Sequence, residues 1–142
     1  MVGRFRVRAG YMDDASHGLR VNVDQLVYQE GVLTPPDTPH CFAYYITILN
    51  EGEETITVRG RKWVVTESNG EVIAVEGDGV VGAFPVLGPG EHFSYNSYHM
   101  IRSTRAIAQG SYLGLTDSGE PVVVRIPSFE LVAPDAGEVG YC

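Results

Sequence analysis

The pattern that most constrains the fold of this chain is a two-residue alternation of apolar and polar side chains, repeated in short runs between turns. In the run 42–49, Phe42, Tyr44, Ile46 and Ile48 fall at every second position. Because successive side chains of a β-strand point to opposite faces, this spacing places all four on one face. No stretch of the chain has the 3.6-residue period of an amphipathic helix. The alternation therefore predicts an all-β fold.

Turn-forming residues separate these runs at regular intervals. Residues 68–71 and 117–119 have the Asn, Asp, Ser and Gly content of tight turns, and the Pro- and Thr-rich stretch 31–41 is predicted to be a loop. Residues 50–53 are predicted to turn the chain back into a hairpin. Later strands are expected at residues 92–100, 106–115 and 122–131. Turns at such spacing are typical of a β-sandwich.

The same alternation predicts which side chains form the core. A change of phase between Val23 and Leu26 predicts a β-bulge or bend near Asp24 and Gln25. The expected core comprises Ile46, Ile48, Ile56, Val58, Trp63, Val65, Val124, Ile126 and Phe129, with Val72, Val75, Val80 and Val81 as further apolar residues.

Charge and cysteine content exclude several classes of protein. The 142 residues carry a formal net charge of −8, which disfavours binding to nucleic acid or to an anionic membrane. No segment approaches the roughly 20 apolar residues of a membrane span, and residues 1–8 lack the apolar centre of a signal peptide, so a cytoplasmic protein is expected. Cys41 and Cys142 have no Cys-x-x-Cys spacing, and both are expected to be free thiols.

The run Gly77-Asp78-Gly79-Val80-Val81-Gly82 matches the Gly-x-Gly-x-x-Gly pattern of dinucleotide-binding loops. A phosphate cradle of that kind needs a helix N-terminus behind it, but residues 83–90 contain two prolines and two glycines. The pattern therefore favours a tight connection between strands, with glycine permitting positive φ. Binding of phosphate or pyrophosphate by backbone N–H groups of Gly77, Gly79 and Gly82 stays open as an alternative.

Six ordered blocks of sequence carry a resemblance to a known family. They are Phe42-Ala43-Tyr44-Tyr45-Ile46-Thr47-Ile48 with Asn50-Glu51-Gly52, Arg61-Lys62-Trp63-Val64-Val65-Thr66 with Asn69-Gly70, Gly77-Asp78-Gly79-Val80-Val81-Gly82, Pro85-Val86-Leu87-Gly88-Pro89-Gly90-Glu91, Gly110-Ser111-Tyr112 and Ile126-Pro127-Ser128-Phe129. In these blocks the chain resembles the ApaG family of small bacterial proteins, which implies an immunoglobulin-like or fibronectin type III-like sandwich of two antiparallel sheets. We place this domain at residues 19–132, with an N-terminal arm at 1–18 and a C-terminal tail at 133–142.

The resemblance also implies a class of function. It links the chain with cobalt and magnesium tolerance in some bacteria, and it implies no enzymatic activity. Related domains occur in eukaryotic F-box proteins and in a polymerase-delta-interacting protein, and for these the resemblance implies a role in binding other proteins. The chain departs from the family pattern at Ser97-Tyr98-His99-Met100-Ile101-Arg102. This stretch is longer and more aromatic than in relatives, which tend to have small residues and proline there.

Residue types that bind metals or catalyse reactions do not form a recognisable pattern. His92 and His99 differ by an odd number of positions, so a regular strand sends them to opposite faces. The histidines are expected at surface or turn positions: His17, His40, His92 and His99. The serines lack a Gly-x-Ser-x-Gly setting, and an acidic turn at Glu51, Glu53 and Glu54 is typical of solvated carboxylates. We therefore predict no catalytic, cofactor-binding or metal-ligating residue.

These observations predict a non-enzymatic module that binds another protein. Tyrosine is a frequent anchor in protein interfaces because it buries a large area at low entropic cost. The anchor candidates are Tyr44, Tyr45, Tyr95, Tyr98 and Tyr112, some of which must belong to the core. Assembly with a second copy of the chain, a small-anion sensor and an undetected hydrolase stay as alternatives.

Overall fold

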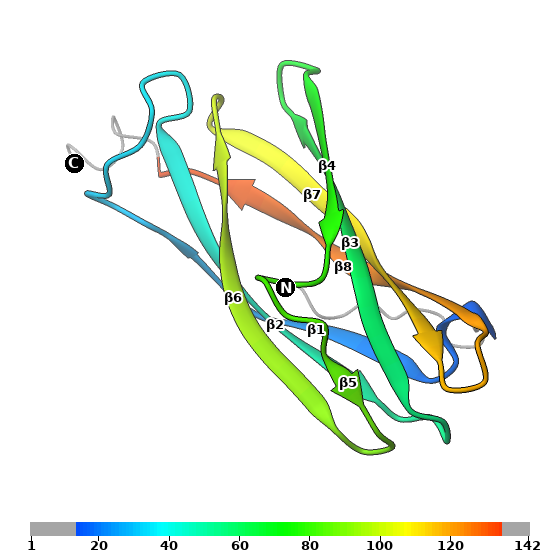
Figure 1. The fold of residues 1–142 in the computed structure, drawn as a ribbon. Coiled ribbons are helices and arrows are strands. Elements are labelled where there is room, and N and C mark those ends of the chain that lie inside the picture. Colours follow the sequence, from blue (N-terminus) through cyan, green and yellow to red (C-terminus); the bar gives the residue numbers. More distant parts are fainter. Residues whose placement is uncertain (1–13, 135–142) are drawn as a thin grey trace.

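The computed structural model describes residues 14–134, which form a short 3-10 helix and eight β-strands (Figure 1). Residues 1–13 and 135–142 lie outside the described residues, and with them Cys142 and most of the predicted arm and tail. The elements are η1 (Asp14–Ser16), β1 (Leu19–Tyr28), β2 (His40–Asn50), β3 (Ile56–Glu67), β4 (Val72–Asp78), β5 (Val86–Leu87), β6 (His92–Ile101), β7 (Arg105–Thr116) and β8 (Pro121–Val132).

The strands form two antiparallel sheets that pack face to face. Sheet A has the order β1-β2-β6, and sheet B has the order β4-β3-β7-β8, with β5 also paired to β3. The predicted sandwich of two antiparallel sheets is therefore confirmed. The register of β1 on β2 shifts between Val23 and Gln25, which confirms the bulge expected from the change of phase.

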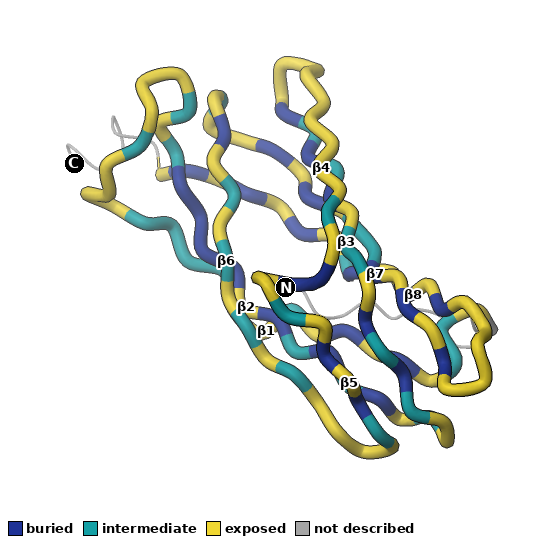
Figure 2. The backbone as a smooth tube through the Cα atoms, in the orientation of Figure 1, coloured by how far each residue is buried: buried dark blue, intermediate teal, exposed yellow. Residues whose placement is uncertain are grey.

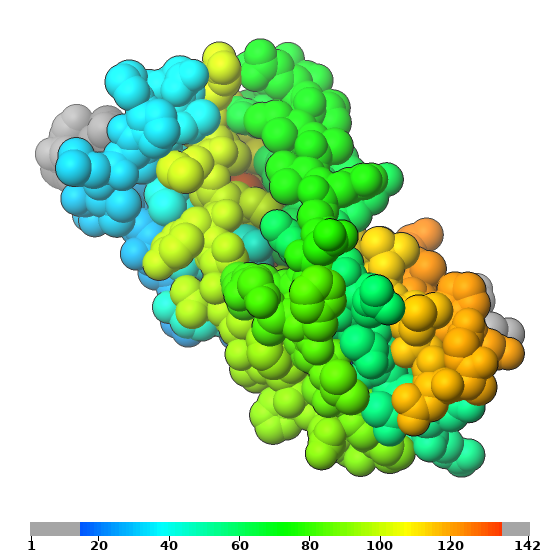
Figure 3. Space-filling model, viewed as in Figure 1, coloured from blue at the N-terminus to red at the C-terminus, as the bar shows by residue number. Residues whose placement is uncertain are grey.

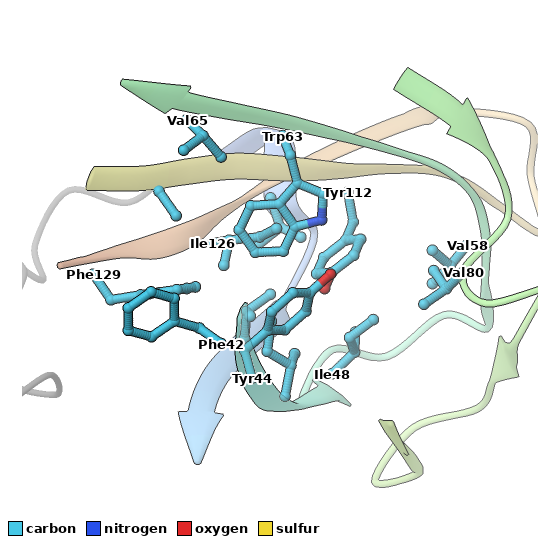
Figure 4. Close-up of a cluster of buried hydrophobic side chains, with 14 of the residues drawn as sticks. Phe42, Tyr44, Ile48, Val58, Trp63, Val65, Val80, Tyr112, Ile126 and Phe129 are labelled. Atoms are coloured by element: carbon cyan, nitrogen blue, oxygen red, sulfur yellow. The ribbon is translucent and has the colours of Figure 1, made fainter. Parts of the chain in front are cut away.

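The core lies between the sheets, where side chains from both inner faces meet (Figures 2 and 4). All nine side chains of the main predicted core are buried, and Trp63, Tyr44 and Phe129 pack together at its centre. The prediction is wrong for three of the additional valines, since Val72, Val75 and Val81 are 59%, 47% and 53% exposed. The alternation in sequence does not show whether a strand of the opposite sheet covers these valines.

The expected hairpin at residues 50–53 is wrong, because β2 and β3 belong to different sheets. The polar residue at the start of this connection, Asn50, is fully buried. Its Nδ2 donates to the carbonyl oxygens of Glu54 and Leu87, each at 2.8 Å, and its Oδ1 accepts the N–H of Gly52 at 2.9 Å. These bonds hold the chain where it crosses from sheet A to sheet B.

A second buried polar residue, Glu67, fixes the opposite end of β3. Its Oε1 accepts the backbone N–H of Ser103 at 2.7 Å and the Ser103 hydroxyl at 2.8 Å, and it shares the N–H of Arg102 with Oε2 at 3.1 Å. Burial alone would raise the pKa of the Glu67 carboxyl, but these hydrogen bonds outweigh burial and lower it. The carboxylate thus attaches the turn between β6 and β7 to sheet B.

The Asn50 bonds generate a test of the crossover. We expect Asn50→Ala to lower the free energy of unfolding by about 2–3 kcal/mol, because the carbonyl oxygens of Leu87, which is buried, and of Glu54 both lose their donor. Asn96→Ala, at an exposed position of β6, is the matched control and should change stability by less than about 0.5 kcal/mol. Urea unfolding followed by tryptophan fluorescence measures both, and equal effects would contradict the structural role of Asn50.

Candidate functional site

The two sheets differ in width, and this difference leaves one side of the sandwich open. On the closed side, β1 lies against β8. On the other side, sheet B extends to β4 while sheet A ends at β6, and no comparable contact joins β4 to β6 within residues 14–134. Figure 3 shows the molecule hollowed between the yellow-green β6 and the green β4.

The register of β3 and β4 shows which residues face this hollow. Trp63 pairs with Val75, and Val65 pairs with Ile73, so both β4 side chains lie on the core-facing side of sheet B. They are nevertheless 47% and 41% exposed, because no strand of sheet A covers them. We call this region the open-side groove and define it by Arg61 and Trp63 of β3, Ile73, Val75 and Gly77 of β4, and Tyr95 and His99 of β6.

An aromatic cluster lies beside the groove. The ring of His99 lies 4.7 Å from that of Tyr44 and 4.6 Å from that of Trp63, measured between ring centroids. Burial lowers the pKa of His99 to about 4, so the imidazole is neutral near pH 7. Its Nε2 and the Nε1 of Trp63 are buried and have no hydrogen-bond partner among the described residues.

The surface position predicted for His99 is therefore wrong. Hydrophobic packing against three aromatic rings holds the imidazole inside the sandwich. The odd spacing from His92 correctly places the two residues on opposite faces, and His92 is exposed. The predicted surface position fails because the sequence does not show which face of β6 meets the core.

The charged residue of the groove is Arg61. A bulge between Val58 and Gly60 changes the phase of β3, which turns Arg61 toward the core side in step with Trp63. Its Nη1 donates to the carbonyl oxygens of Asp78 at 2.9 Å and of Gly79 at 3.1 Å. Within the described part of the chain, no carboxylate forms an ion pair with this guanidinium.

Three tyrosine hydroxyls lie near this positive charge. Burial raises the pKa of Tyr44, Tyr95 and Tyr112, and the charge of Arg61 lowers each by a smaller amount. The hydroxyls of Tyr95 and Tyr112 are hydrogen-bonded to each other across the two sheets. All three phenols therefore stay neutral near pH 7 and supply no anion to Arg61.

Two structural requirements explain the three glycines of the Gly-x-Gly-x-x-Gly run. At Gly77 a Cβ atom would come within 2.7–2.9 Å of three guanidinium atoms of Arg61, so this glycine makes room for the arginine. Gly79 and Gly82 have positive φ of 66° and 81°, as expected for a chain reversal. The N–H of Gly79 donates to the carbonyl of Arg59 at 2.8 Å, so this group is used within the protein.

The turn inside this run has an unusual residue. Val80 and Ala83 exchange two backbone hydrogen bonds, of 2.8 and 2.9 Å, around Val81 and Gly82. Both central residues have positive φ, 42° at Val81 and 81° at Gly82, as in a type I′ turn. A β-branched residue is strained at positive φ, and the Val81 side chain is also 53% exposed.

The structure separates the five predicted tyrosine anchors. Tyr44 and Tyr112 are buried in the core, and Tyr95 is partly buried beside the groove. Tyr45 and Tyr98 are exposed on the outer face of sheet A. The inward orientation of Arg61 was not predicted. Its one signal in the sequence is the even spacing of Arg61 from Trp63 and Val65.

Metal-ligating residue types do not gather in the described part of the chain. No group of three or more His, Cys, Asp or Glu side chains there is placed to hold a metal ion. Glu51, Glu53 and Glu54 are exposed, as expected for a solvated turn. Cys41 is buried and free, and burial raises the pKa of its thiol. No helix within residues 14–134 is long and apolar enough to span a membrane.

Fold and groove together define a small immunoglobulin-like β-sandwich with one open side. The model of the ApaG domain matches residues 30–115, and the chain belongs to this family. Protein ApaG of Xanthobacter autotrophicus is 40% identical over 105 residues, which cover 74% of this chain and 81% of that protein. Protein ApaG of Escherichia coli is 37% identical over 110 residues, covering 78% of this chain and 88% of that protein.

Solved structures agree with this assignment. The crystal structure of the putative ApaA protein from Bordetella pertussis has a TM-score of 0.76 at 33% identity, covering 84% of this chain and 96% of that chain. The PapD-like domain 7 of human CEP192, at 10% identity, has a TM-score of 0.54 and covers 96% and 98% of the two chains. The second similarity concerns the fold alone.

The buried imidazole predicts a pH-dependent stability. Unfolding allows His99 to take up a proton at its ordinary pKa of about 6.5, so stability is retained above that value and falls as the pH drops toward about 4. We expect a loss of roughly 2 kcal/mol between about pH 7.5 and about pH 5. His99→Phe keeps a ring in the cluster and should remove this part of the pH dependence. Urea titrations at both pH values measure the difference, and an unchanged dependence in His99→Phe would contradict a neutral buried imidazole.

The strained turn predicts a stabilising substitution. Asn is favoured at the first central position of a type I′ turn, so Val81→Asn should raise the free energy of unfolding by about 1 kcal/mol. Val86→Asn, at a position 60% exposed in β5, is the control and should not stabilise. Thermal unfolding compares the two variants, and a destabilised Val81→Asn would show that Val81 contributes packing that outweighs its backbone strain.

Proposed function

We propose that this chain is a non-catalytic module that binds another protein, and that the open-side groove is its docking surface. The occupant is an extended strand of the partner, which lies along the free edge of β6 and over the inner face of β4. The observation that carries this proposal is the exposure of Ile73 and Val75 on a core-facing side. A partner strand there would give sheet A a fourth strand and cover the β4 side chains.

Two features of the strand edges support this mode of binding. β4 and β6 each have one neighbour in their sheet, so each has an edge with unpaired N–H and C=O groups. Natural proteins usually protect such edges with charged residues or proline, but β6 contains no Asp, Glu, Lys, Arg or Pro, and the stretch 72–75 of β4 contains none either. Main-chain hydrogen bonds to an edge supply affinity, and alternate side-chain contacts supply specificity.

The proposal extends to the family's association with metals. In this proposal the link to cobalt and magnesium tolerance passes through the partner protein, and the chain itself coordinates no metal ion. The module carries out no reaction of its own and acts through the protein that it binds.

Binding of phosphate or pyrophosphate at Gly77, Gly79 and Gly82 is a second candidate function. One observation favours it, namely the guanidinium of Arg61 beside Gly77. Two others weaken it, since the N–H groups of Gly79 and Val80 donate within the protein and Nη1 of Arg61 already binds two carbonyl oxygens. Calorimetric titration with pyrophosphate tests this candidate separately.

A matched pair of variants tests the docking surface. We expect Val75→Lys to abolish capture of partner proteins from a bacterial lysate, because a charge in the groove opposes burial of the partner's apolar side chains. The control is Val123→Lys on the outer face of β8, where the side chain is 39% exposed. Quantitative mass spectrometry should show the same proteins with wild type and Val123→Lys, and about tenfold less with Val75→Lys.

Two results would contradict this proposal. One is equal recovery by both lysine variants, which would place the docking surface elsewhere. The other is a dimer of the chain in solution that Val75→Lys dissociates and Val123→Lys does not, which would assign the groove to a second copy. Size-exclusion chromatography with light scattering of all three proteins distinguishes these outcomes.

A further inference from the structure

We propose that Arg61 is a carboxylate-binding residue, and that the open-side groove therefore selects an extended peptide with an Asp or Glu side chain at one fixed position. This inference rests on the proposed function and names the chemistry of the partner strand. Arg61 lies on the core-facing side of β3 and forms no ion pair within residues 14–134. Partly buried charges in proteins are normally paired.

The guanidinium is already oriented for binding. Nη1 is fixed by the carbonyl oxygens of Asp78 and Gly79, and the missing side chain of Gly77 leaves space for the group to lie against β4. The other nitrogens, Nη2 and Nε, have no hydrogen-bond partner among the described residues. A guanidinium can bind a carboxylate through two parallel N–H···O bonds, and prior orientation lowers the entropic cost of forming them.

The neighbours of Arg61 favour a carboxylate on a peptide over a free phosphate. Gly77, Val75 and Ile73 follow one another on the inner face of β4, so the groove has one charged position followed by two apolar ones. An extended peptide points every second side chain to the same face. The complementary peptide therefore has an acidic residue with apolar residues two and four positions away, in one chain direction.

The net charge of the chain cannot explain a preference for acidic peptides. A net charge of −8 repels acidic peptides at long range, so general electrostatics cannot produce an acid preference. A preference at one position requires a local cation. Lys62 provides the comparison, because it is the next residue of β3 but faces the outer side and pairs with Glu76 at 3.7 Å.

The test is selection of random decapeptides displayed on phage against the full chain. We expect peptides selected by wild type to have Asp or Glu at one position and apolar residues at the alternate positions beside it. Lys62→Gln removes the same charge from the outer face and should leave this pattern unchanged. Arg61→Gln should remove the acid preference and keep the apolar pattern, and a selected peptide should bind this variant about tenfold more weakly than it binds wild type.

A second variant guards against misfolding of Arg61→Gln. Gly77→Ala keeps the charge but places a Cβ atom against the guanidinium, so it should displace Arg61 and weaken the acid preference. Peptides without a fixed acidic position, or an acid preference that survives both variants, would overturn this inference while leaving strand docking intact. If no peptide is selected, or if Val75→Lys selects every peptide that wild type selects, the proposed function and this inference are both wrong.

Discussion

The packing of Trp63 between the two sheets is the interaction on which the rest of the structure depends. The indole comes from β3 of sheet B and contacts Tyr44 and His99 of sheet A, together with Phe129 of β8. The facing residue on β7 is Gly110, where a Cβ atom would clash with the carbonyl oxygen of Lys62 and lie 3.2 Å from the indole ring, so glycine lets β7 lie close to β3 beside the ring. Burial of one aromatic side chain thus sets the distance between the sheets beside the groove.

The sequence predicted the parts of this fold that depend on local alternation. Phe42, Tyr44, Ile46 and Ile48 are all buried on one face, because the period of two is a property of each strand alone. It could not predict that Val75 is exposed, since exposure depends on the number of strands in the opposite sheet. The hairpin expected at residues 50–53 failed for a similar reason, because a turn composition does not show which sheet the next strand joins.

The candidate site was harder to predict because its residues have ordinary sequence signals. Arg61 stands in a cluster with Arg59 and Lys62 that is typical of a solvated face, and only the bulge in β3 turns it inward. His99 was predicted to be a surface histidine, because the sequence does not show which face of β6 meets the core. The glycine run was predicted to be a tight connection with positive φ, as Gly79 and Gly82 have, but the sequence did not show that Gly77 makes room for Arg61.

The uncharged stretch 72–75 of β4 also has a consequence for solubility. Val72, Ile73, Ala74 and Val75 form an exposed run of high β-propensity without proline or charge, which is the composition of segments that nucleate aggregation. Glu71 and Glu76 flank this run on either side. Charged residues in such flanking positions oppose aggregation of an apolar segment. A partner strand in the groove would cover the two inward-facing side chains of this run, Ile73 and Val75, and would so reduce the apolar surface through which two copies of the domain could aggregate.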